Sequence, residues 1–114
     1  AMLTTAAADK AVCLRFPTRD LPCFTVWKNT MAMEEGYVVG LEPATNYPNF
    51  RTFVRQLGRV RTLAPGGTWE CRWSIEVVDK PEGVVALTRE VAALQAQSRA
   101  TIHRAPQPRF SAQA

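Results

Sequence analysis

A strict alternation of apolar and polar residues over 68–78 is the sequence feature that most constrains the fold. Apolar side chains take every second position of this segment: Trp69, Cys71, Trp73, Ile75 and Val77. Successive side chains of a β-strand point to opposite faces, so a period of two predicts a strand with one buried face. We therefore expect an antiparallel sheet, with Trp69 and Trp73 in its core.

Other segments complete the predicted sheet and add helices. Strand-like composition covers residues 11–16, 21–28, 37–42 and 58–63. A short helix is expected over 51–56. Apolar residues then recur at helical spacing and predict an amphipathic helix over 84–98: Val84, Leu87, Val91 and Leu94. The predicted fold is mainly β, an antiparallel β-sandwich with a C-terminal helix.

The predicted organisation of the chain has four parts. Residues 1–10 are expected to be a disordered or expression-derived leader, and 11–79 the sandwich portion. Residues 80–100 are expected to be a linker and the amphipathic helix, and 101–114 a flexible tail. A chain of 114 residues is one domain at most.

Composition argues against several classes of protein. The hydrophobic fraction of 46% and charged fraction of 21% are typical of a globular protein. No apolar run approaches the roughly 18 residues of a membrane span, and glutamates dilute the net charge of +4, so we expect neither a membrane nor a nucleic-acid partner. The three cysteines show no metal-binding spacing and the one histidine is His103, which predicts a cytoplasmic protein with reduced thiols, no metal and no cofactor.

The candidate site centres on Glu42, at the end of the expected strand 37–42. Gly40 lies on the same face of that strand and has no side chain, so it leaves room beside the carboxylate. Pro43 cannot donate a ladder hydrogen bond, so we expect strand pairing to stop there. A carboxylate with open space before it is suited to act as a general base.

Three blocks of the sequence carry a family resemblance. They are Phe-Thr-Val-Trp-Lys-Asn at 24–29, the segment 37–49 around Leu-Glu-Pro, and Leu-Ala-Pro-Gly-Gly at 63–67. Together they resemble the galactose mutarotase-like (aldose 1-epimerase) superfamily, and most closely its bacterial branch DUF4432. The resemblance spans residues 12–78 and implies the C-terminal part of a mutarotase-like supersandwich.

The resemblance also implies a function. It implies a monosaccharide or sugar derivative as the substrate, and it assigns Glu42 the role of the base that takes the proton of the anomeric hydroxyl. The partner histidine that acts as the acid in such epimerases has no match before His103. We therefore expect this chain to be a piece of a larger protein, and the alternative is a shortened relative that has lost half of the site. The family's Thr-Gln after the glutamate is replaced here by Pro43-Ala44-Thr45, and sugar contacts are not carried beyond Glu42.

Further candidate substrate contacts lie on both sides of Glu42. Trp27 could stack on a sugar ring, although core packing is favoured. Asn46, Asn49 and Arg51 could hydrogen-bond sugar hydroxyls, although asparagines equally serve loop geometry. Glu42 itself could instead be an exposed acid, or one paired with Arg51.

Two other classes of function fit the same residues. A non-catalytic carbohydrate-binding β-sandwich would keep the aromatic and amide contacts and would need no acid. An assembly element would form a homo-oligomer through an exposed sheet edge or through the C-terminal helix.

Overall fold

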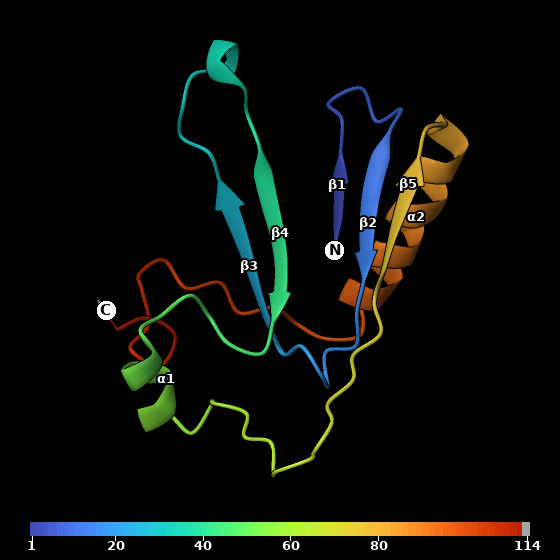
Figure 1. Cartoon of the computed structure of the whole chain (residues 1–114). Helices are drawn as coiled ribbons and strands as arrows, with labels where there is room; N and C mark the ends of the chain where they lie inside the picture. Colours follow the sequence, from blue (N-terminus) through green and yellow to red (C-terminus); the bar gives the residue numbers. More distant parts are fainter. Residues whose placement is uncertain (113–114) are drawn as a thin grey trace. The chain divides into compact units, whose positions relative to one another are not determined.

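The computed structural model describes residues 1–112, which form two compact units (Figure 1). Unit 1 contains Ala1–Arg15 and Trp73–Ile102. Unit 2 contains Phe16–Arg72 and the C-terminal segment from His103. The fold is mainly antiparallel β, as predicted, with a long helix towards the C-terminus. Among the described residues, no helix is both long and apolar enough to cross a membrane.

Unit 1 is built on a three-stranded antiparallel sheet. Its strands are β1 (Met2–Thr4), β2 (Ala11–Arg15) and β5 (Ser74–Val78), in the order β1-β2-β5. Residues 1–10, expected to be a disordered leader, thus contribute a strand that pairs Leu3 with Val12. The sequence pattern could not reveal so short a strand, because three residues carry no measurable period.

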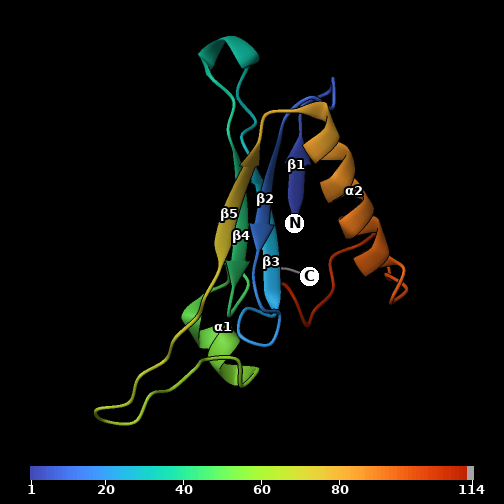
Figure 2. The ribbon, with the colours of Figure 1, turned by 90° about the vertical axis from the view of Figure 1, so that its right-hand side faces the viewer.

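Helix α2 (Pro81–Gln95) packs on one face of this sheet (Figure 2). Pro81 occupies the first helical turn, where its fixed φ angle suits the helix and its missing N–H is not needed. The helix therefore begins three residues before the predicted start at 84. Its apolar stripe meets the sheet in the core of unit 1, which joins Ala11 and Cys13 to Val84 and Leu87, with Met2 and Val78 beside them.

The other face of the β2–β5 pair carries apolar side chains that remain exposed. Ile75 and Val77 are 55% and 73% exposed. The predicted strand over 68–78 is confined to Ser74–Val78, the part that pairs with β2. The prediction that Trp69 and Trp73 lie in a core was wrong, since they are 39% and 56% exposed. Alternation sets which residues share a face, but a partner must cover that face before it is buried.

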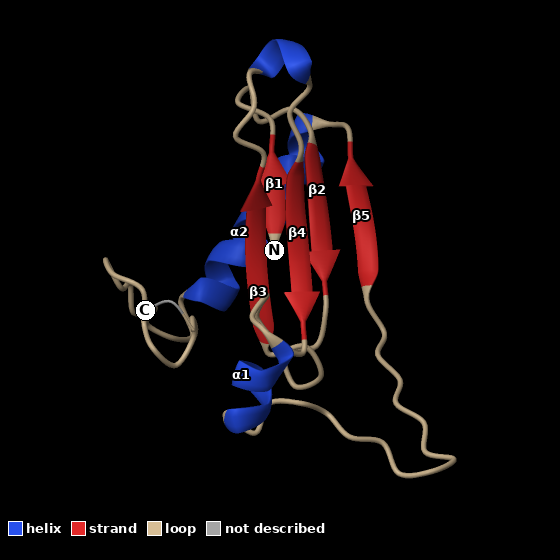
Figure 3. Cartoon of the chain, turned by 60° about the vertical axis from the view of Figure 1, so that its left-hand side comes forward, coloured by secondary structure: helices blue, strands red, loops and turns tan. Residues whose placement is uncertain are grey.

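Unit 2 contains an antiparallel hairpin of β3 (Cys23–Lys28) and β4 (Val39–Ala44). The short 3-10 helix η1 (Met33–Glu35) lies in the connection between the two strands, and α1 (Arg51–Gln56) follows β4 (Figure 3). Both strands were predicted from their composition, and α1 has the predicted bounds.

Pairing continues through Pro43, contrary to the prediction that it would stop there. Phe24 pairs with Pro43, and Cys23 pairs with Ala44. The Asn29 N–H donates to the Val38 carbonyl, and hydrogen-bonded pairs alternate with non-hydrogen-bonded ones in an antiparallel ladder. This alternation makes Phe24–Pro43 a non-hydrogen-bonded pair, so proline's lack of an N–H does not interrupt the ladder.

The strand predicted over 58–63 is absent from the described structure. Gly58 adopts a φ of +66° and ends the α1 turn. The Arg59 N–H then bonds back to the Val54 carbonyl at 3.0 Å, which turns the chain out of the helix. Without a neighbouring strand, the β-like composition of 58–63 has no ladder to join.

Candidate functional site

One face of the β3–β4 hairpin brings Trp27 and Glu42 together. The register sets Thr25 opposite Glu42 and Trp27 opposite Gly40. Because side chains alternate along both strands, these four residues share a face. We call this surface the Trp27–Glu42 face. Trp27 is 51% exposed and Glu42 is exposed, so both side chains are accessible to a ligand.

Gly40 makes the space that Glu42 occupies. A Cβ atom added at Gly40 would lie 2.6 Å from Oε1 of Glu42 and 3.3 Å from the Cβ of Trp27. The gap expected beside Glu42 is therefore real, and the carboxylate of Glu42 itself folds back over the glycine. The carboxylate thus lies over Gly40, the cross-strand neighbour of Trp27, rather than extended away from the sheet.

The other predicted contacts follow β4: Asn46 and Asn49 lie on the loop and Arg51 begins α1. Asn49 donates from Nδ2 to the Phe110 carbonyl at 2.9 Å and accepts at Oδ1 from the Ala112 N–H at 3.3 Å. Its amide thus holds the C-terminal segment. Asn46 Oδ1 is buried and has no hydrogen-bond partner within the described residues. Arg51 is the exposed first residue of α1 and forms no ion pair with any described residue, Glu42 included.

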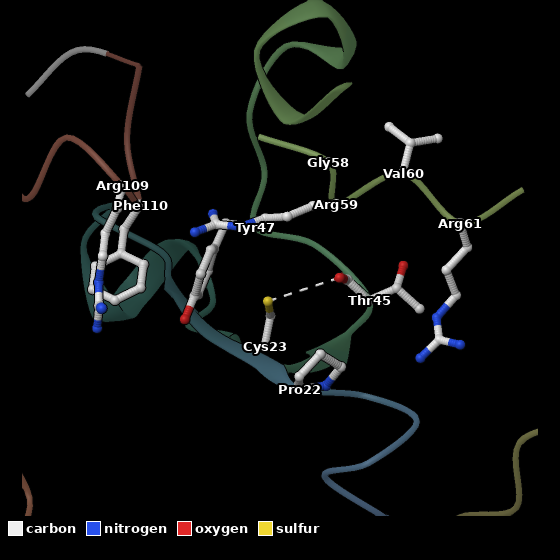
Figure 4. Close-up of a pocket in the computed structure, with 10 residues that line it drawn as sticks. All are labelled: Pro22, Cys23, Thr45, Tyr47, Gly58, Arg59, Val60, Arg61, Arg109 and Phe110. Carbon is white, nitrogen blue, oxygen red and sulfur yellow. Dashed lines mark hydrogen bonds between the residues drawn. The ribbon is translucent and has the colours of Figure 1, made fainter. Parts of the chain in front are cut away.

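A pocket of about 510 Å³ lies at the end of the hairpin where β3 begins and β4 ends (Figure 4). We call it the arginine pocket, because three guanidinium groups line it and, among the described residues, no carboxylate does. Its lining residues are Pro22, Cys23, Thr45, Tyr47, Gly58, Arg59, Val60, Arg61, Arg109 and Phe110. None of the predicted site residues is among them.

Aromatic and guanidinium groups pack together in this pocket. The Tyr47 and Phe110 rings meet edge to face, with centroids 5.3 Å apart. The guanidinium carbon of Arg59 lies 5.8 Å from the Tyr47 centroid and 5.9 Å from that of Phe110. Arg109 lies over Phe110 at 4.3 Å. These are distances at which cations interact with aromatic rings.

Tyr47 keeps its proton more firmly than a tyrosine in water. Burial is the main cause that raises the pKa of its hydroxyl above the ordinary value of 10.0, and the neighbouring Cys23 adds to the effect. Arg59 and Arg109 oppose the shift because a cation favours the phenolate. At neutral pH the hydroxyl is therefore a hydrogen-bond donor.

Sequence reasoning missed the arginine pocket for two reasons. The stretch 51–61 contains four arginines, at positions 51, 55, 59 and 61, but the local sequence does not show which of them line a pocket. Arg109 and Phe110 lie in the segment expected to be a flexible tail, and the contact of Phe110 with Tyr47 spans more than sixty positions. No local signal predicts such a pairing.

Among the described residues, no three side chains of histidine, cysteine, aspartate or glutamate lie close enough together to hold a metal ion.

The sequence was compared with curated proteins, with solved structures and with models of protein families. Neither the curated proteins nor the solved structures returned a match. A family model described as "Domain of unknown function (DUF4432)" matches residues 1–77, which is more than half of the 114 residues. The matched segment includes both strands of the Trp27–Glu42 face. This chain belongs to the DUF4432 family.

Proposed function

We propose that the protein binds a monosaccharide or sugar derivative on the Trp27–Glu42 face and interconverts its anomers, as aldose 1-epimerases do. The observation that carries this proposal is that a half-exposed tryptophan shares a strand face with a carboxylate that folds back over Gly40, the cross-strand neighbour of that tryptophan. An indole ring offers an apolar face to the C–H groups of a sugar, and a carboxylate accepts hydrogen bonds from its hydroxyls.

Glu42 is the general base of the proposed reaction. Its carboxylate takes the proton of the anomeric hydroxyl, the C1–O1 bond becomes a carbonyl, and the bond between C1 and the ring oxygen breaks. The ring oxygen takes a proton from an acid. Rotation about C1–C2 and the reverse steps then give the other anomer. Apart from Glu42, the Trp27–Glu42 face carries no carboxylic acid and no histidine, so the proposal assigns the acid to a group outside this face.

The wider assignment to a mutarotase-like sandwich is part of the same proposal. The antiparallel pairing of both sheets supports it. The thiols of Cys13, Cys23 and Cys71 form no disulfide, which supports a reducing compartment such as the cytoplasm.

Anomer-exchange NMR on a panel of aldoses tests the catalytic part of the proposal. We expect the protein to accelerate exchange for at least one sugar, and we expect Glu42→Gln to lower that acceleration by about 10²- to 10⁴-fold, the usual contribution of a general base. Glu34→Gln, at an exposed glutamate of η1, is the matched control and should leave the rate unchanged. Equal rates for both variants would contradict the role of Glu42.

A non-catalytic sugar-binding role is a second candidate, favoured by the exposure of Trp27. Saturation-transfer NMR separates the two. Binding without any acceleration of exchange would support the binder, and Trp27→Ala should then abolish binding. Trp73→Ala is the control, since Trp73 is similarly exposed, at 56% against 51% for Trp27. Loss of binding in the Trp73 variant alone would overturn both candidates.

A further inference from the structure

The arginine pocket is a concave site with a strong charge preference, and none of its lining residues belongs to the Trp27–Glu42 face. Arg59, Arg61 and Arg109 line it together with the hydroxyl-bearing side chains of Thr45 and Tyr47, and no acidic residue within 1–112 lines it. Guanidinium groups hold their positive charge at every physiological pH. The pocket therefore favours an anion over a neutral or cationic ligand.

The three arginines are not equivalent. Arg61 donates from Nη2 to the Asp20 carbonyl at 3.0 Å, so it holds the turn before β3. Its guanidinium also lies 5.3 Å from the centroid of the Trp69 ring. In Figure 4, Arg61 lies on the opposite side of the pocket from Arg109. Arg61 thus has structural partners of its own.

Arg59 lacks the partner that its charge requires. Its Nη1 is shielded from water and has no hydrogen-bond acceptor among the described residues. The Tyr47 and Phe110 rings attract its charge through their faces but do not replace an acceptor oxygen. A buried donor without an acceptor destabilises a protein, and it marks a place where an absent partner belongs.

We propose that the arginine pocket binds a phosphate monoester, with Arg59 and Arg109 as its cationic contacts. Both guanidinium groups lie over the same Phe110 ring, at 5.9 Å and 4.3 Å from its centroid. We assign the unpartnered N–H of Arg59 to a phosphate oxygen. The Tyr47 and Thr45 hydroxyls supply neutral donors to the remaining oxygens.

The charge of the pocket favours phosphate over a carboxylate. A phosphate monoester carries close to two negative charges at pH 7 and presents three acceptor oxygens. Two guanidinium groups and two hydroxyls match that set of acceptors, whereas a carboxylate has one charge and two oxygens.

The C-terminal segment that carries Arg109 is fixed in place. Asn49 binds the backbone of Phe110 and of Ala112, and the Phe110 ring packs against Tyr47. Arg109 is therefore held at the pocket by contacts other than its own charge. A site whose cations are already positioned loses less conformational entropy when a ligand binds.

Calorimetric titration with inorganic phosphate, and separately with glycerol phosphate, tests the proposal. We expect saturable binding to the wild-type chain, weakened about tenfold or more by Arg59→Gln and by Arg109→Gln, since each removes a charge-assisted hydrogen bond. Arg55→Gln is the matched control, because Arg55 is an exposed arginine of α1 outside the pocket. Acetate should bind at least tenfold more weakly than phosphate.

Three results would overturn the proposal. They are an absence of saturable phosphate binding to the wild type, equal weakening by Arg55→Gln, and acetate binding as tight as phosphate binding. Thermal melting identifies a variant that fails to fold. If either Arg59→Gln or Arg109→Gln does not fold, the other variant and the titration of the wild type still test whether the pocket binds phosphate. The proposal is independent of the sugar site, since Arg59→Gln should leave the binding of a neutral monosaccharide unchanged and Trp27→Ala should leave phosphate binding unchanged.

Discussion

At the scale of single residues, the arrangement of the candidate sugar site depends on the missing side chain of Gly40. The glycine was identified from the sequence because it precedes Glu42 by two positions on one strand. The sequence did not reveal that the carboxylate itself would fill the space, since χ angles are set by neighbours such as Trp27 across the ladder. The absence of a side chain at Gly40 therefore allows the carboxylate of Glu42 to lie over the strand.

Gly40→Ala should separate stability from function. The new Cβ would meet Oε1 of Glu42 at 2.6 Å, and a flexible carboxylate can move away with little loss of energy. Alanine is also favoured over glycine within a strand by roughly 0.5–1 kcal/mol. We expect the free energy of unfolding to stay within about 1 kcal/mol of wild type, and any anomer exchange to fall by about 10²-fold because the base is displaced.

Urea denaturation and exchange NMR on the same sample measure both quantities. Gly36→Ala is an instructive contrast. Gly36 has a φ of +89° and open space around it, so alanine there strains the backbone without touching Glu42. Full activity in Gly40→Ala would show that the folded-back position of the carboxylate has no role.

At the scale of elements, α2 is fitted to the sheet of unit 1 through Gly83. A Cβ atom at Gly83 would lie 2.4 Å from Cγ1 of Val78. Val78 packs against the apolar core of unit 1, and a β-branched side chain has little freedom about χ1. The close approach of helix and strand therefore requires a glycine at this position.

Gly83→Ala should destabilise unit 1 even though alanine is the better helix former. Overpacking costs about 1–3 kcal/mol, which exceeds the roughly 0.5–1 kcal/mol that alanine gains over glycine in a helix. The expected sign is a lower urea midpoint. In a Val78→Ala background the same change should be neutral or stabilising, because the clash is gone. A Gly83→Ala variant more stable than wild type would contradict the close packing.

At the scale of the whole molecule, unit 1 joins distant parts of the chain through charge as well as apolar contact. Arg15 on β2 forms ion pairs with Glu76 on β5 and with Glu90 on α2, and both of its partners are partly exposed. The hydrogen bonds from Arg15 are the main cause that lowers the pKa of Glu90 below its ordinary value of 4.5. The Glu90 carboxylate is thus more favoured in the folded protein than in the unfolded one.

The lowered pKa gives a pH dependence with a definite sign. The stability that Glu90 contributes is fully present above the ordinary value of 4.5 and is lost as the pH falls through the lower folded value. Glu90→Gln should lower stability at neutral pH and flatten the loss of stability below pH 4.5. Thermal melts of both proteins across about pH 2–7 measure how stability depends on pH. Glu82→Gln, on the same helix but in none of the ion pairs recorded among the described residues, should keep the wild-type profile.

Much of the chain could be predicted from local patterns, and the misses have a common cause. The strands β2 and β3 follow from short-range sequence patterns and α1 has the predicted bounds, whereas the placement of Trp27 and Glu42 on one face depends on the register of the hairpin. The exposed Trp69 and Trp73, the absent strand at 58–63 and the arginine pocket depend on which distant segment lies opposite. Periodicity shows which side chains share a face of a strand or helix, but not which distant segment packs against that face in the folded chain. The predicted homo-oligomer stays a prediction.

The placement of Pro43 has a consequence for solubility. Because Phe24–Pro43 is a non-hydrogen-bonded pair, the backbone nitrogen of Pro43 faces the outer edge of β4, which pairs with no further strand in the two-stranded sheet of unit 2. A further strand that tried to dock on this edge would meet a position with no N–H to donate. Exposed edges are the usual templates for uncontrolled aggregation, and a proline on one blocks growth of the sheet. Pro43 thus disfavours the addition of a further strand to β4 and leaves the hydrogen bonds between β3 and β4 intact.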